Sequence, residues 1–258
     1  MCTTCGCNTT EHYHDQGDGH HHGHHHDHTR VLSMVTGEKK ISVETDILSR
    51  NNLLAMSNRE IFAEKGIFVL NLVSSPGSGK TSLLEKTLRD LSSTTRCATI
   101  EGDQQTDNDA VRIAATGVPV KQINTGAACH LDAQMISYAI NEFDLDDLDL
   151  LFIENVGNLV CPASFDLGEN HKVVVLSVTE GEDKPLKYPH MFHAADVMLI
   201  NKIDLLHHVD FDLAKCKKMA LWVNPDITIL DVSAKTGEGM AEWYAWLAAG
   251  VRKHAACA

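Results

Sequence analysis

Short apolar runs alternate with amphipathic segments along most of this chain. From residue 67 onward, runs rich in Val, Ile and Leu have the composition of buried strands: IFVLNLV at 67–73, CATI at 97–100, LLFI at 150–153, KVVVLSV at 172–178, DVMLI at 196–200 and ITILDV at 227–232. Amphipathic segments of helical character follow most of them. The pattern therefore predicts an α/β fold, with a mainly parallel sheet covered by helices on both faces and ligand-binding turns at the carboxyl ends of the strands.

The chain before these runs divides into two unlike parts. Residues 1–35 are polar and rich in Gly and His, and they carry too little apolar surface to offset the entropy of ordering, which predicts a flexible tail. Residues 42–65 predict a helix that ends at Gly66. Its apolar positions recur at helical spacing: Ile47, Leu48, Leu54, Ile61 and Phe62. We therefore expect a Cys/His-rich tail at 1–35 and one domain at 36–258 that opens with this helix.

Composition narrows the choice of partners. The formal net charge is −13 and no basic stripe is visible, which argues against a nucleic-acid partner. No apolar run is long enough to cross a bilayer, and the N-terminus lacks the pattern of a secretory signal, so we expect a cytoplasmic protein without a membrane partner. In a reducing compartment, the eight cysteines favour metal ligands or reduced core thiols over disulfides.

A phosphate-binding motif follows the first predicted strand. The segment SSPGSGKTSLL at 74–84 stands between a strand and a helix, which is the context that a P-loop requires. Its glycines let successive backbone N–H groups point at the phosphates, Lys80 supplies a cation, and the hydroxyl of Thr81 suits Mg²⁺. Ser74 stands where the usual motif has its first Gly. The predicted phosphate-binding residues are Gly77, Ser78, Gly79, Lys80, Thr81 and Ser82.

Two carboxylates at predicted strand ends are candidates for the magnesium site. Asp103 follows CATIEG, and Glu154 follows LLFI. We favour Asp103 together with Thr81 for magnesium, and we take Lys80, Asp103 and Glu154 as the catalytic residues. The residue that orients the attacking water is left open.

Two later motifs indicate that the base is guanine. NKID, with Asn201, Lys202 and Asp204, follows the strand DVMLI, and SAK at 233–235 follows ITILDV. The Asp204 carboxylate can accept from both N1–H and the exocyclic amine of guanine, whereas adenine offers an acceptor and no amine at those places. Ser233 and Ala234 are predicted to close over the base, and Lys235 is predicted to belong to the same nucleotide-binding site. The chain is thus expected to hydrolyse GTP to GDP and phosphate.

Two groups of Cys and His residues suggest metal binding. Cys2, Cys5 and Cys7 place three thiols on a short segment, and thiolates select nickel, copper(I) or zinc over magnesium. The run HHHGHHHDH follows and would buffer nickel or zinc. Within the domain, Cys129, His130 and Cys161 form a second candidate group. Their spacing lacks the CxxC pattern of structural zinc sites, so the pattern alone leaves metal ligands and ordinary core residues both open. Cys97, Cys216 and Cys257 are assigned no function.

These motifs together resemble one family, the HypB hydrogenase nickel-insertion GTPases. That family belongs to the SIMIBI class of dimerising P-loop proteins, with the signal-recognition GTPases and the urease nickel GTPase. The resemblance covers residues 42–258, and the family's P-loop also begins with Ser, as at Ser74. It rests on a set of motifs: SSPGSGKT, EGDQQTDND, NTGAACHLDA, ENVGNLVCP, GEDKPLKYP, NKIDL and SAKTGEG.

The resemblance implies a function as well as a fold. It implies a GTP-dependent homodimer, with a metal site at Cys129, His130 and Cys161 in the dimer interface that holds nickel as cargo or zinc. It also implies slow GTP hydrolysis with Mg²⁺, coupled to nickel delivery to the hydrogenase large subunit, and an accessory zinc/nickel chaperone of the HypA type. Only some members carry the amino-terminal CxxCGC motif, which Cys2, Cys5 and Cys7 match.

Two other functions remain as alternatives. The chain could be a nickel-storage protein in which the GTPase domain is accessory to the metal-binding tail. Delivery to urease is less favoured, because Cys129 and His130 lie in NTGAACHLDA, whereas the urease family has a Cys-Pro-His pattern.

Overall fold

The computed structural model describes residues 29–104 and 107–256 of the chain. The predicted tail ligands Cys2, Cys5 and Cys7, the histidine run and Cys257 lie outside the described residues. The flexibility of the tail therefore stays a prediction. No helix in the described part is both long and apolar enough to span a membrane.

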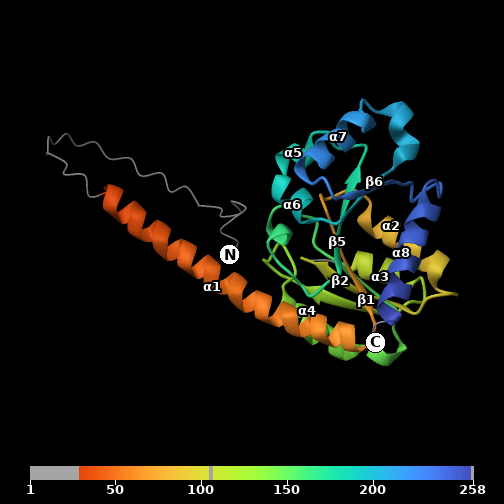
Figure 1. The fold of residues 1–258 in the computed structure, drawn as a ribbon, viewed down its shortest axis with the longest axis horizontal. Coiled ribbons are helices and arrows are strands. Elements are labelled where there is room, and N and C mark those ends of the chain that lie inside the picture. The colour runs from red at the N-terminus through yellow and green to blue at the C-terminus, as the bar shows by residue number, and fades with distance from the viewer. Residues whose placement is uncertain (1–28, 105–106, 257–258) are drawn as a thin grey trace.

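A sheet of seven strands, all parallel to their neighbours, forms the centre of the fold (Figure 1). Its order is β3-β2-β4-β1-β5-β6-β7. The strands are β1 Phe68–Ser74, β2 Cys97–Asp103, β3 Val120–Asn124, β4 Leu150–Glu154, β5 His171–Ser177, β6 Val197–Asn201 and β7 Thr228–Asp231. The predicted parallel sheet is confirmed, and β1 and β4 are neighbours, which brings the residues after these two strands together.

One strand was not predicted. The β3 strand, Val120–Asn124, is half-buried or exposed along its length, and within the described residues it stands at the edge of the sheet with β2 as its neighbour. An edge strand does not need apolar side chains on both faces, so its sequence VKQIN lacks the apolar run from which the other strands were predicted.

Helices cover both faces of the sheet, as predicted. They are α1 Thr29–Glu64, α2 Lys80–Leu91, α3 Asn108–Ala114, α4 Ala133–Ala139, α5 Lys184–Lys187, α6 Pro189–Ala194, α7 Leu213–Val223 and α8 Met240–Ala255. Alternate side chains of β1 show how the two layers form. Phe68, Leu70 and Leu72 pack with residues of α2, α3 and α8, whereas Val69 and Val73 pack on the other face, with residues of α1, α4, α6 and α7.

The first helix, α1, begins earlier than predicted. The sequence predicts a helix at 42–65, but α1 runs from Thr29 to Glu64 and therefore includes the last residues of the predicted tail. Apolar periodicity identifies the part of a helix that packs against the domain, not the residue at which the helix begins. No proline interrupts this stretch to end the helix. In Figure 1 the C-terminal part of α1 lies beside α4, and its N-terminal part extends away from the sheet.

At Gly168, just before β5, the chain passes so close to α1 that no side chain fits. Gly168 has φ +93°, and a Cβ atom there would lie 2.7 Å from Asn58 Cβ and 2.8 Å from Ala55 O. Gly117 has a similar φ of +83°, but a Cβ atom there would have no neighbour within 4 Å. The two glycines thus share a backbone conformation and differ in their surroundings.

We expect Gly168→Ala to lower the free energy of unfolding by at least about 3 kcal/mol, because left-handed strain and overlap with the α1 backbone add together. Gly117→Ala carries only the backbone strain and should cost about 1 to 2 kcal/mol. Urea unfolding followed by tryptophan fluorescence measures both. Equal losses for the two variants would show that α1 is free to shift away.

Candidate functional site

The loop between β1 and α2 has the geometry of a phosphate cradle. Gly77 and Gly79 have φ of +79° and +88°, and a Cβ atom at Gly79 would lie 2.8 Å from Asn201 Nδ2. Ser78 is 1% exposed. Its Oγ has no hydrogen-bond partner among the described residues. A buried hydroxyl without a partner in a glycine-bearing turn fits a phosphate oxygen.

Glu154, at the end of β4, contacts the two side chains that the sequence assigns to phosphate and magnesium. Its Oε1 accepts from Lys80 Nζ and from Thr81 Oγ1, each at 2.7 Å. Glu154 is only 1% exposed. Its Oε2 is buried and has no partner in the described part of the chain. A hydroxyl beside a carboxylate oxygen with spare acceptor capacity is the donor set that Mg²⁺ prefers, so these residues fit that ion.

Asp103, which the sequence favours for magnesium, ends β2, where its Oδ1 accepts from the N–H of Gln104 at 2.5 Å. Thr81 Oγ1 donates to the Glu154 carboxylate. The assignment of Asp103 to magnesium stays a prediction.

Sequence reasoning missed a third carboxyl group, that of Glu101. It pairs in register with Glu154 across β2 and β4, is 2% exposed, and its Oε2 has no partner among the described residues. Burial, and next the charge of Glu154, raise the pKa of Glu101 to about 8. The sequence signal was present, because Glu101 lies two positions before Asp103 and so on the same face of the strand.

The predicted base-reading residues also come together. Asn201 Nδ2 donates to the carbonyl of Ser78 at 3.0 Å, and its Oδ1 accepts from the N–H of Ala234 at 3.2 Å. Asn201 thereby joins the phosphate cradle to the loop after β7. The Ser233 hydroxyl donates to Asp204 Oδ1 at 2.6 Å, which holds the carboxylate in place.

Two lysines contact the phosphate cradle, whereas two of the predicted nucleotide-binding residues are exposed. Lys202 has φ +63° and donates through Nζ to the carbonyl of Gly77 at 2.7 Å. Lys184, which the sequence did not single out, donates to Ser75 Oγ at 3.1 Å and adds a cation beside the cradle. Ser82, by contrast, is exposed and accepts at 2.9 Å from Arg112 on α3. Lys235 is exposed on the loop after β7.

Cys129, His130 and Cys161 form one cluster. Their ligand atoms all lie within 4.8 Å of one another. Cys129 Sγ lies 3.1 Å from Cys161 Sγ and 3.9 Å from His130 Nδ1. Both thiols are buried, and burial lowers the pKa of His130, which favours the neutral imidazole that a metal binds. Two thiols and an imidazole suit nickel or zinc.

The cluster joins two loops that are far apart in the sequence. Cys129 and His130 lie between β3 and α4, whereas Cys161 follows β4. Asn158 Nδ2 donates to the carbonyl of Cys129 at 3.3 Å and links the loops directly. The ring of Phe165 lies on that of His130, with centroids 4.0 Å apart.

Two buried asparagines of α1 hold the same pair of loops. Asn51 accepts from the N–H of Ala133 at 2.9 Å and donates to the carbonyl of Asp166 at 2.7 Å. Asn58 donates to the carbonyls of Ala133 at 2.9 Å and Leu167 at 3.1 Å. Since these partners follow His130 and Cys161 closely in the chain, the position of α1 fixes how the two loops meet.

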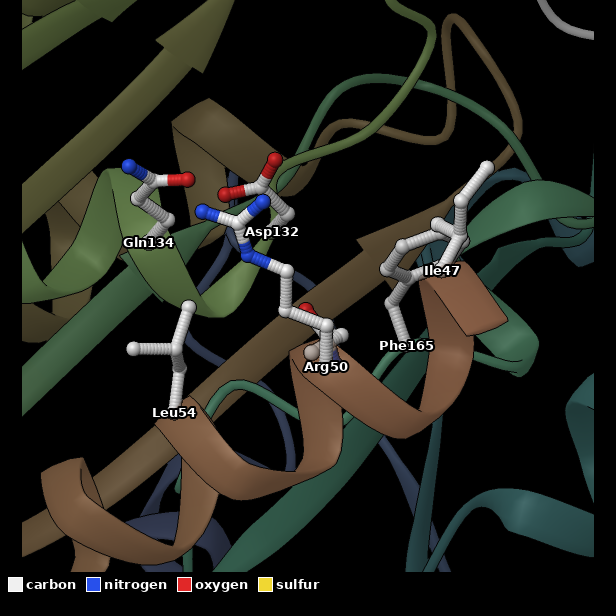
Figure 2. A pocket seen from close by; sticks show the side chains of 7 residues that line it. Ile47, Arg50, Leu54, Asp132, Gln134 and Phe165 are labelled. Atoms are coloured by element: carbon white, nitrogen blue, oxygen red, sulfur yellow. The ribbon is translucent and has the colours of Figure 1, made fainter. Parts of the chain in front are cut away.

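A hollow of about 190 Å³ lies between α1 and the two loops. Figure 2 shows Ile47, Arg50 and Leu54 on the α1 side, facing Asp132 and Phe165. Phe165, which lines the hollow, also contacts the ring of His130.

The other described cysteines, Cys97 and Cys216, are buried in the core, where burial raises the pKa of each thiol to about 12. Neither joins the cluster of ligand atoms.

Parallel strands that deliver a phosphate-binding turn and a base-reading loop to one edge of the sheet define the class of P-loop nucleotide-binding proteins. Residues 68–231 match the family described as CobW/HypB/UreG, nucleotide-binding domain. The chain is 59% identical over 234 residues to the hydrogenase maturation factor HypB of Escherichia coli (strain K12), covering 90% of this chain and 80% of that protein. It is 52% identical over 294 residues to HypB of Rhizobium leguminosarum bv. viciae, covering 99% of this chain and 98% of that protein.

A solved structure agrees with these relatives. The crystal structure of HypB from Helicobacter pylori in complex with nickel superimposes with a TM-score of 0.75 at 41% identity, covering 79% of this chain and 96% of that one. The chain belongs to the HypB family of hydrogenase maturation factors.

Glu101 makes the stability of the protein depend on pH. In the folded protein without metal or nucleotide, Glu101 keeps its proton up to a pKa of about 8, whereas in the unfolded chain it loses it near 4.5. The folded state therefore binds more protons in this window, and the free energy of unfolding falls as pH rises through it. We expect Glu101→Gln to remove this loss. The free energy of unfolding of the variant, relative to that of the wild type, should therefore rise by roughly 3 to 5 kcal/mol between about pH 5 and about pH 9.

Urea unfolding at a series of pH values measures this difference. Glu238→Gln provides the control, since it makes the same change at an exposed position outside the site. Parallel curves for the wild type and Glu101→Gln would show that Glu101 ionises normally in the folded protein.

Proposed function

We propose that this chain is a GTP-hydrolysing nickel metallochaperone, in which the nucleotide controls the ion held by Cys129, His130 and Cys161. One observation carries the proposal. Glu154 contacts Lys80 and Thr81 of the phosphate cradle, and the loop that follows Glu154 carries Cys161 to the cluster with Cys129 and His130, here called the metal cluster.

Nucleotide binding must change the contacts of Glu154. Lys80 and Thr81 donate to Glu154 here, but a bound triphosphate and its Mg²⁺ would take both groups. Thr81 and Glu154, with Asp103 as a further candidate, would hold the ion, which neutralises charge on the phosphates. Lys80 would then turn to the phosphates, and Glu154 would be left to contact the ion or water.

Guanine recognition rests on Asp204. The hydroxyl of Ser233 orients its carboxylate, and Asn201 ties the base loop to the cradle through the carbonyl of Ser78. Charge-assisted hydrogen bonds to guanine are worth about 1.5 to 3 kcal/mol each, which is enough to favour GTP over ATP.

Nickel is the proposed cargo. HypB of Helicobacter pylori has been crystallised with nickel, and this chain carries two thiols and an imidazole in one cluster. Three ligands leave coordination positions open, which a second copy of the chain can fill in a GTP-dependent homodimer. Zinc suits the same donors. The acceptor is the hydrogenase large subunit, reached with the help of an accessory chaperone of the HypA type.

The test of this function is whether nucleotide and nickel binding are linked. The full chain carrying Cys2→Ser, Cys5→Ser and Cys7→Ser is titrated with nickel in the presence of GDP or a non-hydrolysable GTP analogue. The thiolate-to-nickel charge-transfer absorption reports only cysteine-bound metal, so the tail histidines do not contribute. We expect the two nickel affinities to differ by about 5- to 150-fold, and the absorption to be lost in Cys161→Ala. Identical titrations with the two nucleotides would contradict the proposal.

The base specificity has its own test. Asp204→Asn should weaken GTP binding by about 10² to 10⁴-fold, because the charged acceptor is lost and the amide N–H₂ faces the amine of guanine. The same variant should bind xanthosine triphosphate better than the wild type, since xanthine has a carbonyl in place of that amine. Asp226→Asn, an exposed change before β7, is the control. Unchanged GTP affinity in Asp204→Asn would remove Asp204 from the base site.

A further inference from the structure

Four buried polar side chains form a continuous row across β4, β1 and β5. We call Asn155, Asn71, Glu169 and Lys172 the polar relay. Asn155 Nδ2 donates to Asn71 Oδ1 at 3.2 Å, and Asn71 Nδ2 donates to Glu169 Oε1 at 3.0 Å. Lys172 Nζ lies 3.6 Å from the same Glu169 oxygen. All four residues are 8% exposed or less.

The two ends of the polar relay lie at the two sites already described. At one end, Asn155 directly follows Glu154, the residue that contacts Lys80 and Thr81. At the other end, Lys172 Nζ donates to the carbonyls of Pro162 at 2.8 Å and Phe165 at 3.1 Å. Pro162 is the residue after Cys161, so the row ends on the turn that holds the thiol.

A branch of the relay reaches the other metal loop. Asn155 Oδ1 accepts from the N–H of Leu131 at 3.1 Å, and Leu131 directly follows His130. One amide group next to Glu154 therefore contacts the chain beside His130 and, through Asn71, the chain beside Cys161. Both halves of the metal cluster depend on its position.

Stability alone does not account for this arrangement. A buried ion pair such as Lys172 with Glu169 is often no more stabilising than apolar side chains of the same size, since both charges lose their hydration. Asn71 lies between apolar neighbours in the most central part of β1, where an apolar residue would extend the core. What a fully hydrogen-bonded row adds is a single geometry, in which moving one member disturbs the next.

We propose that the polar relay is a set of positioning residues that carries the nucleotide state from Glu154 to both loops of the metal cluster. The inference rests on the proposed function, and it names the residues by which that coupling occurs. When Lys80 and Thr81 turn to the nucleotide, Glu154 loses two donors and moves. Asn155 moves with it, and its hydrogen bonds to Leu131 and Asn71 pass the shift to the two metal loops.

The main test replaces members of the polar relay. The background is the full chain that also carries the three tail replacements Cys2→Ser, Cys5→Ser and Cys7→Ser. Asn71→Leu keeps the number and branching of the side-chain heavy atoms and removes both hydrogen bonds of the side chain. The double replacement Glu169→Gln with Lys172→Met removes both buried charges together, so that neither is left unpaired. The measured quantity is the ratio of nickel affinities with GDP and with the GTP analogue, read from the charge-transfer absorption. We expect the ratio to fall to within about twofold of unity in both variants, while each still binds nickel and GDP.

Asn224→Ala is the matched control. Asn224 donates to the carbonyls of Phe192 at 3.1 Å and Ala195 at 2.8 Å, at the end of α7, so its loss removes similar hydrogen bonds elsewhere. The control should keep the wild-type ratio. A wild-type ratio different from unity that persists in the relay variants overturns the relay and leaves the proposed function intact. A wild-type ratio of unity overturns both.

Hydrogen exchange in the protein with an intact polar relay tests the proposal even if the relay variants do not fold. The N–H groups of Leu131 and Leu167 donate to Asn155 Oδ1 and Glu169 Oε2. Their hydrogen-exchange rates should differ by about tenfold or more between the GDP and GTP-analogue states. The N–H of Lys215, which donates to Asp212 Oδ1 at 2.9 Å, should not change. Equal rates for Leu131 and Leu167 in the two states contradict the relay.

Discussion

The contact of the Glu154 carboxylate with Lys80 and Thr81 is the interaction on which the rest of the site depends. It exists because β1 and β4 are parallel neighbours, so the loops after both strands leave the sheet at the same edge. A carboxylate that is 1% exposed requires strong partners, and a nucleotide with its metal ion would compete for the same two. In the proposed function, this contact is what makes the loop after β4 respond to a bound nucleotide.

The metal cluster is built by loops, but its geometry is set by what packs against them. Asn51 and Asn58 of α1 hydrogen-bond to backbone groups of both loops, and Asn158 joins one loop to the other. A helix that is remote from the phosphates therefore shares in positioning Cys129 and Cys161.

Most of the fold and much of the site followed from local sequence patterns. Six apolar runs corresponded to β1, β2 and β4–β7, while the polar edge strand Val120–Asn124 was missed because only its pairing with β2 makes it a strand. The predicted start of α1 was also wrong, since apolar spacing identifies only the part of a helix that packs against the domain. Ser82 lies in the first turn of α2, where its hydroxyl accepts from Arg112, and its assignment to phosphate stays a prediction.

The sequence by itself determined which residue types stand at the strand ends, and it predicted from them the groups for phosphate, guanine and a soft metal ion, because each prediction depends on a residue type at a fixed offset from a strand or helix. Only the tertiary structure decided which of these groups meet. Glu154 contacts Thr81, Glu101 pairs in register with Glu154, and Cys161 reaches Cys129 from another loop. The order of strands in the sheet and the packing of α1 bring these residues together, and such long-range pairing leaves no local pattern in the chain.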